Sequence, residues 1–291
     1  MHVNINSKSD IENHKDYVLD YEHWMLNLKD LQVQQDIANN FQKAQCFDEI
    51  FTDTEIDWIY GYAFSRCKTV RHNDNGTIFI SGNLQGIYEK FANRLTEILP
   101  GAENSPVVGG NFFITPDQYG LHNDSTRESD WIKSLEKTPR DNNKRKWVPW
   151  RNIIIPLYTA PKNIESHAVF FDQRHVDFAH VYNHGMKLQD IATTYPIVTD
   201  HSTINFHLLN GVIQSQENNL KTYDKLHHEE YLYYTPHRRL TGLTPELTCE
   251  WKPKCPIVFD AVQLHATNKG RKDKQWTLKM GLLLTFLREV K

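Results

Sequence analysis

The sequence predicts an α+β fold with a β-sheet core, and three observations lead to this prediction. Apolar residues recur at helical spacing in three stretches of roughly the first hundred residues. From Pro106 onward the chain changes to short runs rich in Val, Ile, Phe and Thr, separated by Pro, Gly and Asn. One long segment of weak periodicity interrupts these runs. Helices followed by strands favour a sandwich or barrel of strands with the helices packed outside.

Residues 1–46 are predicted to form a helical extension that precedes the main domain, residues 47–291. The extension contains no Gly or Pro, and its apolar residues recur at helical spacing between Tyr17 and Leu31. The start of the chain has no cationic stretch followed by an apolar run, which argues against a secretory signal.

Two further helices are expected at the beginning of the main domain. The first has Thr52 or Asp53 as its N-cap. Its apolar stripe consists of Ile56, Ile59, Tyr60 and Ala63. The second helix runs from about Leu84 and is ended by Pro100-Gly101. Both helices would pack against the sheet through their apolar faces.

Six runs have the composition expected of strands, at residues 107–114, 151–158, 167–172, 245–251, 256–266 and 276–287. The segment of about 173–244, between the third and fourth runs, is rich in His and Tyr. Insertions of this length in a compact domain are usually functional, so we expect it to act as a lid or a substrate-binding element.

Composition and charge argue against several classes of function. The 291 residues carry a net charge of −3, so no basic excess points to nucleic acid or to an anionic membrane surface. No apolar stretch approaches the roughly 20 residues that span a bilayer. The four cysteines form no Cys-x-x-Cys pair and predict no disulfide framework. We therefore expect a soluble, cytoplasmic protein of a reducing compartment.

A candidate metal site is indicated by the spacing of histidine and aspartate. Two histidines and one carboxylate suit Fe(II) and leave coordination positions open for other ligands. Alternate residues at the end of a strand share a face, so His-x-Asp supplies two of the three ligands. The sequence contains this pattern four times, as His14–Asp16, His72–Asp74, His122–Asp124 and His175–Asp177.

The positions of these pairs relative to the predicted strands favour His122–Asp124. This pair follows the run 107–114 and a turn, and at least four candidate strands remain downstream to return a third ligand. The pair His175–Asp177 also follows a strand and stays as an alternative. The other two pairs lie in the polar extension and in an Asn- and Asp-rich turn, where these residue types serve backbone geometry.

His265 is the expected third ligand, because it comes at the end of an apolar run, residues 256–266. The next run, residues 276–287, contains a single charged residue, Lys279. An unpaired ammonium group buried among apolar neighbours is strongly unfavourable. Lys279 therefore faces either solvent or a fixed anion.

Four stretches carry a resemblance to a known family: FDEIFTDTEIDWIY, NFFITPDQYGLHND, RNIIIPLY and PIVFDAVQLHATN. Together with their order, they make the region Phe47 to Leu287 resemble the Fe(II)/2-oxoglutarate-dependent oxygenases, in the group that includes prolyl hydroxylase-like and phytanoyl-CoA hydroxylase-like enzymes. The resemblance implies a double-stranded β-helix, the jelly-roll core also found in cupins. It implies Fe(II), 2-oxoglutarate and O2, with release of succinate and CO2.

Matched residue by residue, the resemblance implies His122, Asp124 and His265 as the iron ligands. Family members that halogenate lack the carboxylate, so the presence of Asp124 implies hydroxylation of an unactivated C–H bond. The expected substrate is a small polar or anionic molecule or an amino-acid residue.

The resemblance also implies a basic residue in the last strand that binds the far carboxylate of 2-oxoglutarate. Lys279 is the favoured candidate, fourteen positions after the third iron ligand (279 − 265), although arginine is the commoner residue in the family. Arg271 and Lys274, in the preceding loop, are alternatives. Tyr158 and Asn111 are further candidate contacts to the same molecule.

Arg238, Arg239 and Tyr234 in the insertion are candidate substrate-binding residues, because guanidinium groups bind carboxylates well. The alternative is that they are surface residues of a covering loop. A different class of function also stays open, namely a non-catalytic β-barrel that binds a small acid or a metal. A structural zinc site usually has four protein ligands, so a set of three counts against that class.

Overall fold

The computed structural model describes residues 40–72, 76–105, 107–116, 119–122, 124, 147–162, 164–175, 181–183, 223–240, 243–268 and 277–289. The helical pattern between Tyr17 and Leu31 lies outside these ranges, as do Arg271 and Lys274. None of the helices in the described ranges is both long enough and apolar enough to cross a membrane.

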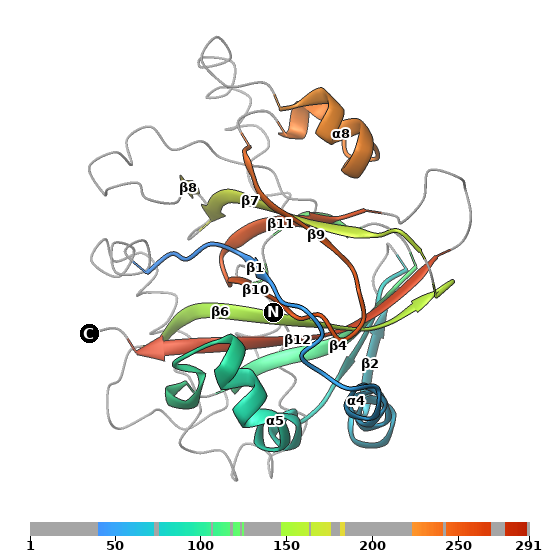
Figure 1. Cartoon of the computed structure of the whole chain (residues 1–291), viewed down its shortest axis with the longest axis vertical. Coiled ribbons are helices and arrows are strands. Elements are labelled where there is room, and N and C mark those ends of the chain that lie inside the picture. The colour runs from blue at the N-terminus through green and yellow to red at the C-terminus, as the bar shows by residue number, and fades with distance from the viewer. Residues whose placement is uncertain are drawn as a thin grey trace.

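Two antiparallel sheets face each other and form the body of the molecule (Figure 1). The larger sheet contains, in order, β1 (Gln45–Cys46), β10 (Ile257–Asp260), β6 (Trp147–Ala160), β12 (Leu278–Glu289), β4 (Val107–Thr115), β3 (Ile78–Ser81) and β2 (Thr69–His72). The smaller sheet contains, in order, β5 (Tyr119–His122), β11 (Gln263–Thr267), β7 (His167–His175) and β8 (Val181–Asn183). A further strand, β9 (Pro245–Glu250), also pairs with β7.

The strand order is that of a double-stranded β-helix. Counting from β4 and leaving out the short strand β8, the sixth, third, eighth and first strands lie side by side in the larger sheet. The second, seventh, fourth and fifth strands do so in the smaller sheet. Successive strands thus change sheet at every step except from the fourth to the fifth, in the manner of a jelly roll. The predicted fold class is confirmed.

Two helices cover the outer face of the larger sheet, α4 (Asp53–Arg66) and α5 (Gln85–Ile98) (Figure 1). Thr52 is the N-cap of α4, and its side chain and that of Glu55 form a reciprocal capping box. Gly101, with φ of 97°, follows α5 and begins the short 3-10 helix η2 (Ala102–Asn104). Both predicted helices are confirmed, but Tyr60 is 44% exposed and does not belong to the buried stripe.

The outer face of the smaller sheet is covered by part of the long insertion. The helix α8 (Lys225–Tyr231) and the 3-10 helix η4 (His237–Leu240) lie in this part. Leu232, Leu240 and Leu243 are buried against Val169 and Leu264 of the sheet. The described part of the insertion therefore packs as a structural cover, and β8 extends the edge of the same sheet.

The apolar run 256–266 was predicted as one strand, and that prediction is wrong. The run forms β10 and β11, which belong to different sheets and are separated by a turn at residues 261–262. Every residue of both strands is buried. The hydrophobic pattern therefore contains no signal for the point where the chain crosses from the larger sheet to the smaller one. The β2–β3 hairpin was also not predicted.

Residues 40–46 contact the β-sheet body that follows them in the chain, and Ala44 is buried there. The strand β1 pairs with β10 at the edge of the larger sheet. The buried ion pair between Arg151 Nη1 and Asp260 Oδ1, 2.6 Å apart, anchors the chain just before this strand. The Arg151 guanidinium donates to the backbone carbonyls of Gln42 and Lys43, and the Asp260 carboxylate accepts from the Gln42 backbone N–H.

A disulfide joins Cys46 of β1 to Cys249 of β9, across a sequence separation of 203 residues. It links the edge of the larger sheet to the smaller sheet. The expectation that the cysteines form no disulfide is therefore wrong for this pair, since pairing at such a distance leaves no local sequence pattern. Cys67 and Cys255 are buried as free thiols.

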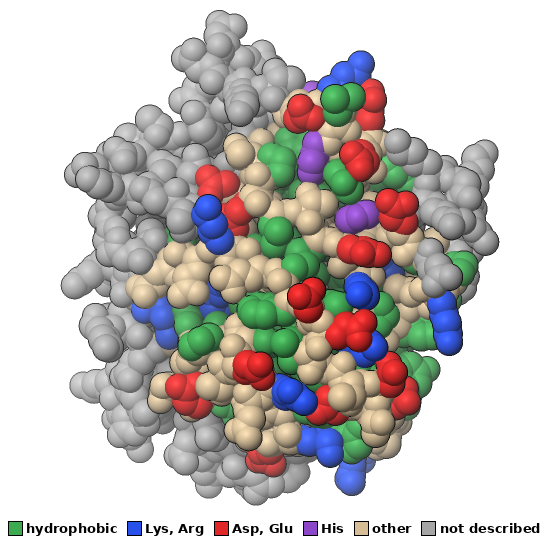
Figure 2. All heavy atoms as spheres, in the orientation of Figure 1, with side chains coloured by type: hydrophobic (Ala, Val, Ile, Leu, Met, Phe, Trp, Pro, Cys, Tyr) green, Lys and Arg blue, Asp and Glu red, His purple; other side chains and the backbone are tan. Residues whose placement is uncertain are grey.

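Acidic and basic side chains are interspersed over the described part of the face in Figure 2. Elsewhere in the described residues, the Lys254 ammonium lies 2.7 Å from a Glu49 carboxylate oxygen and 3.3 Å from Asp53 Oδ1. The expectation that nucleic acid is not a partner stays a prediction.

Candidate metal centre

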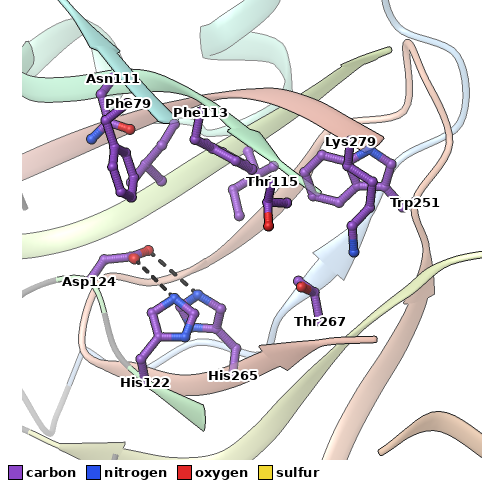
Figure 3. Close-up of a pocket in the computed structure, with 12 residues that line it drawn as sticks. Phe79, Asn111, Phe113, Thr115, His122, Asp124, Trp251, His265, Thr267 and Lys279 are labelled. Carbon is purple, nitrogen blue, oxygen red and sulfur yellow. Dashed lines mark ion pairs between the residues drawn. The ribbon is translucent and has the colours of Figure 1, made fainter. Parts of the chain in front are cut away.

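His122, Asp124 and His265 come together at one end of the smaller sheet. His122 is the last residue of β5, and it lies directly opposite His265 in the pairing of β5 with β11. The two imidazole rings are 4.1 Å apart between centroids. The Asp124 carboxylate faces both, with Oδ1 at 3.6 Å from His122 Nε2 and Oδ2 at 3.7 Å from His265 Nε2 (Figure 3).

Backbone hydrogen bonds orient the two histidine rings. His122 Nδ1 lies 2.6 Å from the Gly120 carbonyl oxygen, and His265 Nδ1 lies 3.0 Å from that of Gln263. A carbonyl only accepts, so Nδ1 carries a proton in each ring, and Nε2 is the nitrogen that lies toward Asp124. Nε2 of each ring is thereby placed as the nitrogen that can bind a metal.

The donor set fits a divalent metal. One ligand atom from each of His122, Asp124 and His265 can be chosen so that all lie within 4.8 Å of one another. Among the residues that the structure describes, this is the one group of three or more histidine, cysteine or acidic side chains arranged in this way. Two imidazoles and a carboxylate on one side of a cation suit Fe(II) and leave other coordination positions open.

The alternative pair His175–Asp177 is described only in part. The backbone of His175 ends β7 and pairs with Val181 of β8, whereas Asp177 lies outside the described ranges. The same holds for His72, which ends β2 while Asp74 is not described.

The metal-binding candidates line a cavity of about 60 Å³ between the two sheets (Figure 3). Its walls are formed by Phe79, Asn111, Phe113, Thr115, His122, Asp124, Ile154, Trp251, His265, Thr267, Lys279 and Leu283. Figure 3 shows the triad at one end and Lys279 at the other, with Thr115 and Thr267 between them. A cavity of this size holds several water-sized groups.

Lys279 is buried, with only 1% of its surface exposed. Its ammonium donates to Ser166 Oγ at 3.0 Å and to the Asn268 carbonyl oxygen at 2.6 Å. It also lies 5.8 Å from the centroid of the Trp251 ring, a distance at which a cation–π attraction operates. Of the two environments expected for this lysine, the solvent-facing one is ruled out.

One histidine near this end of the cavity does not add a second positive charge. His167 begins β7, and its backbone N–H donates to the Asn268 side chain. Burial lowers the pKa of the His167 imidazole, and the nearby Glu165 and Glu250 carboxylates oppose that shift only in part. The ring is therefore neutral at pH 7.

Asn111 and Tyr158 have different surroundings, although both were predicted to contact 2-oxoglutarate. Asn111 lines the cavity and is 2% exposed, and within the part of the chain that the structure describes its Oδ1 has no hydrogen-bond partner. Tyr158 is 42% exposed and lies outside the cavity, contrary to the prediction.

A β-bulge is the physical reason for the position of Tyr158. Where β6 pairs with β12, Pro156 lies opposite Gly281 and Tyr158 lies opposite Met280, so β6 has one extra residue. The extra residue moves Tyr158 to the outer face and brings Thr159 opposite Lys279.

The predicted substrate residues of the insertion do not reach the cavity where they can be followed. Tyr234 packs its ring against the outer cluster of the smaller sheet, and its hydroxyl donates to the Thr267 carbonyl oxygen. It therefore contacts a cavity-lining residue without lining the cavity itself, and its role in substrate binding stays a prediction. Arg238 and Arg239 lie in η4, and their side chains are outside the described part of the chain.

Sequence reasoning missed several side chains that shape the site. Ser166 and Asn268 hold the ammonium of Lys279, and Asn152 donates from Nδ2 to Asp124 Oδ2 at 2.8 Å. A signal for Asn152 was present, since it is a lone amide beside the apolar run Ile153–Ile155. Ser166 lies in a loop and has no comparable signal.

No family model and no curated protein matches this chain. Among solved structures, it is similar to the non-heme alpha-ketoglutarate-dependent epimerase SnoN from nogalamycin biosynthesis, with 7% identity and a TM-score of 0.42, covering 90% of this chain and 83% of that one. It is similar to HygX from Streptomyces hygroscopicus, solved with nickel and 2-oxoglutarate, with 10% identity, a TM-score of 0.41, and coverage of 87% and 85%. A prolyl-4-hydroxylase from Pseudomonas putida has 8% identity, a TM-score of 0.35, and coverage of 89% and 98%. The assignment of the fold rests on the strand order described above.

Proposed function

We propose that this protein is an Fe(II)- and 2-oxoglutarate-dependent dioxygenase. It hydroxylates an unactivated C–H bond of a small polar or anionic molecule or of an amino-acid residue, and releases succinate and CO2. The observation that supports the proposal most is that two unlike sites share one cavity, a triad of metal-type donors and a buried lysine. A keto acid with a second carboxylate has a keto-acid group for the metal site and a carboxylate for the lysine.

In this proposal His122, Asp124 and His265 hold Fe(II), which supplies the oxidative chemistry together with 2-oxoglutarate and O2. The two histidines bind the metal through Nε2, because their Nδ1 atoms are engaged by backbone carbonyls. Asp124 provides the carboxylate that favours hydroxylation over halogenation in the proposed reaction.

Lys279 binds the far carboxylate of 2-oxoglutarate. Its ammonium is fixed by Ser166 and Asn268, so little side-chain freedom remains to be lost when the anion binds. The anion also offsets a positive charge that is buried beside the Trp251 ring. Asn111 has a buried amide on the same cavity wall and is the second proposed contact to 2-oxoglutarate.

Apolar side chains exclude bulk water from the space between these groups. Phe113 and Trp251 pack edge to face, 5.7 Å apart between centroids, and both line the cavity. Gly281 makes this packing possible, because a Cβ at that position would lie 2.6 Å from Phe113 and 2.9 Å from Trp251. Low polarity here strengthens the attraction between Lys279 and a bound carboxylate.

Conversion of 2-oxoglutarate to succinate, measured with Fe(II) in air and without added substrate, tests the proposal. The wild-type protein is expected to form succinate slowly, and His122→Ala to lose both this turnover and metal binding. Tyr158→Phe is the matched control, because the exposed ring lies outside the cavity and its hydroxyl is not required. A wild-type protein that forms no succinate, with metal binding that survives His122→Ala, would contradict the proposal.

The rival function is a non-catalytic protein that binds a small acid or a metal. It predicts that 2-oxoglutarate binds, as measured by calorimetry, and that no succinate forms with or without added substrate. The same experiment therefore separates the two functions.

A further inference from the structure

The three candidate metal ligands are not held equally by the fold. His122 and His265 lie on adjacent strands and directly oppose each other, so the sheet fixes both backbones. Asp124 lies two residues beyond the end of β5 and is not part of a strand. Its carboxylate therefore needs an additional constraint to stay between the two imidazoles.

Asn152 supplies a constraint from the opposite sheet. It lies on β6, which pairs with β10 on one side and with β12 on the other. Its Nδ2 donates to Asp124 Oδ2 at 2.8 Å. Because Asn152 belongs to a strand paired on both sides, this hydrogen bond ties the carboxylate to one of the most rigid parts of the fold.

Stability alone does not account for an asparagine at this position. Asn152 is fully buried, and its cross-strand neighbours are Thr285 and Phe259. Its Oδ1 has no hydrogen-bond partner among the described residues, although the atom is shielded from solvent. An amide buried with an unmatched acceptor is less favourable than an apolar side chain of similar volume. A residue that opposes local packing in this way points to a functional constraint.

We propose that Asn152 is a positioning residue for the metal centre, and the inference rests on the metal centre of the proposed function. Its amide holds the Asp124 carboxylate so that one oxygen faces each histidine before any metal binds. Groups that orient metal ligands in this manner contribute about 10- to 100-fold to metal affinity.

Titration of the metal-free protein with Ni²⁺ tests this role, with heat of binding as the readout. Ni²⁺ is chosen because it binds imidazole tightly and needs neither 2-oxoglutarate nor turnover. Asn152→Leu, which keeps the volume and removes the donor, is expected to raise the Ni²⁺ Kd about 10- to 100-fold. Thr285→Val is the matched control: this neighbour is also buried, its hydroxyl has no partner among the residues that the structure describes, and the expected change in Kd is less than about twofold.

Measurement in a protein that carries Asp124→Ala separates a positioning role of Asn152 from general damage to the fold. If Asn152 acts through Asp124, Asn152→Leu has no further effect on Ni²⁺ affinity in a protein that already carries Asp124→Ala. An equal loss in both backgrounds would show a structural role and overturn the inference, as would a Kd for Asn152→Leu within about twofold of wild type. Thermal unfolding of the metal-free proteins identifies a variant that does not fold, and Asn152→Ala then takes the place of Asn152→Leu.

The inference and the proposed function fail in different ways. Tight Ni²⁺ binding that depends on Asn152 and Asp124, without succinate formation in the wild type, contradicts the dioxygenase and supports the positioning role. Succinate formation with unchanged Ni²⁺ affinity in Asn152→Leu contradicts only the positioning role. Absence of Ni²⁺ binding in the wild type overturns both.

Discussion

On its outer face β12 presents Met280, Leu282, Leu284 and Phe286, whereas on its inner face it presents Lys279, Gly281, Leu283 and Thr285. All eight of these residues are buried. The outer set packs under α4 and α5 in one apolar cluster. The inner set faces the cavity and the opposite sheet, and it includes a charged and a hydroxyl side chain.

The two faces show that burial by itself does not distinguish core from site. On the outer face, apolar side chains contribute free energy of folding in proportion to the surface they bury. On the inner face, the ammonium of Lys279 and the hydroxyl of Thr285 are buried at positions where apolar residues would fold more favourably. Polar residues on an otherwise buried sheet face are thus the better guide to function.

The largest expected effect comes from the outer face, and it falls on stability. Phe286→Ala removes a fully buried ring that packs beside Tyr88, so we expect the free energy of unfolding to fall by about 3–5 kcal/mol. Urea unfolding of the metal-free protein measures this change. The contrast between the two faces of β12 is contradicted if Phe286→Ala instead leaves stability intact and weakens 2-oxoglutarate binding.

The next largest effect comes from the inner face, and it falls on ligand affinity. Lys279→Met removes the ammonium while nearly keeping the volume, so the Kd for 2-oxoglutarate is expected to rise on the order of 100-fold. Stability without ligand is expected to stay similar or to increase, because a buried charge has been removed. Calorimetric titration and urea unfolding of the same variant measure the two quantities. Unchanged 2-oxoglutarate affinity would return the role to Arg271 or Lys274.

The smallest effect concerns the cover over the smaller sheet and depends on pH. His227 in α8 contacts the Tyr223 hydroxyl through Nδ1 and Thr248 Oγ1 through Nε2. Burial lowers the pKa of His227 from its ordinary value of 6.5, with Asp224 and Glu230 opposing the shift. The detached state of α8 therefore takes up a proton at higher pH than the packed state, and packing loses stability as pH falls below about 6.5.

Hydrogen exchange of α8 between pH 7.5 and 5.5 tests this dependence, after correction for the intrinsic exchange rate. Protection is expected to fall in the wild type and to change less in His227→Gln, which cannot titrate. Amides of β12 on the larger sheet provide the internal control, and an equal loss of protection there would contradict a local effect. A local effect would mean that the outer covers of the two sheets differ in pH sensitivity.

Much of the outer architecture could be predicted from the sequence because it depends on local patterns. The N-cap Thr52 and the stop at Pro100-Gly101 are short-range signals, and the structure has both. The run that forms β12 contains a single charged residue, Lys279, which is evident from the sequence. A lone charge in an apolar strand is informative because burial makes it unfavourable without a partner.

The features that could not be predicted are set by contacts between distant segments. The crossing from β10 to β11 is hidden because both strands are buried throughout. The bulge that turns Tyr158 outward is a property of its pairing with β12, which the sequence of β6 does not contain. Asn152 is a lone amide in the sequence, but the pattern does not indicate its partner, Asp124, which is 28 residues away on another part of the chain.

The disulfide between Cys46 and Cys249 gives the chain a topology beyond its strand order. It closes residues 46–249 into a covalent ring, with the rest of the C-terminal part leaving as a tail. His122 and Asp124 belong to the ring, whereas His265 and Lys279 belong to the tail. A single cut of the backbone within the ring would leave both products tethered, so the two halves of the candidate centre would not separate.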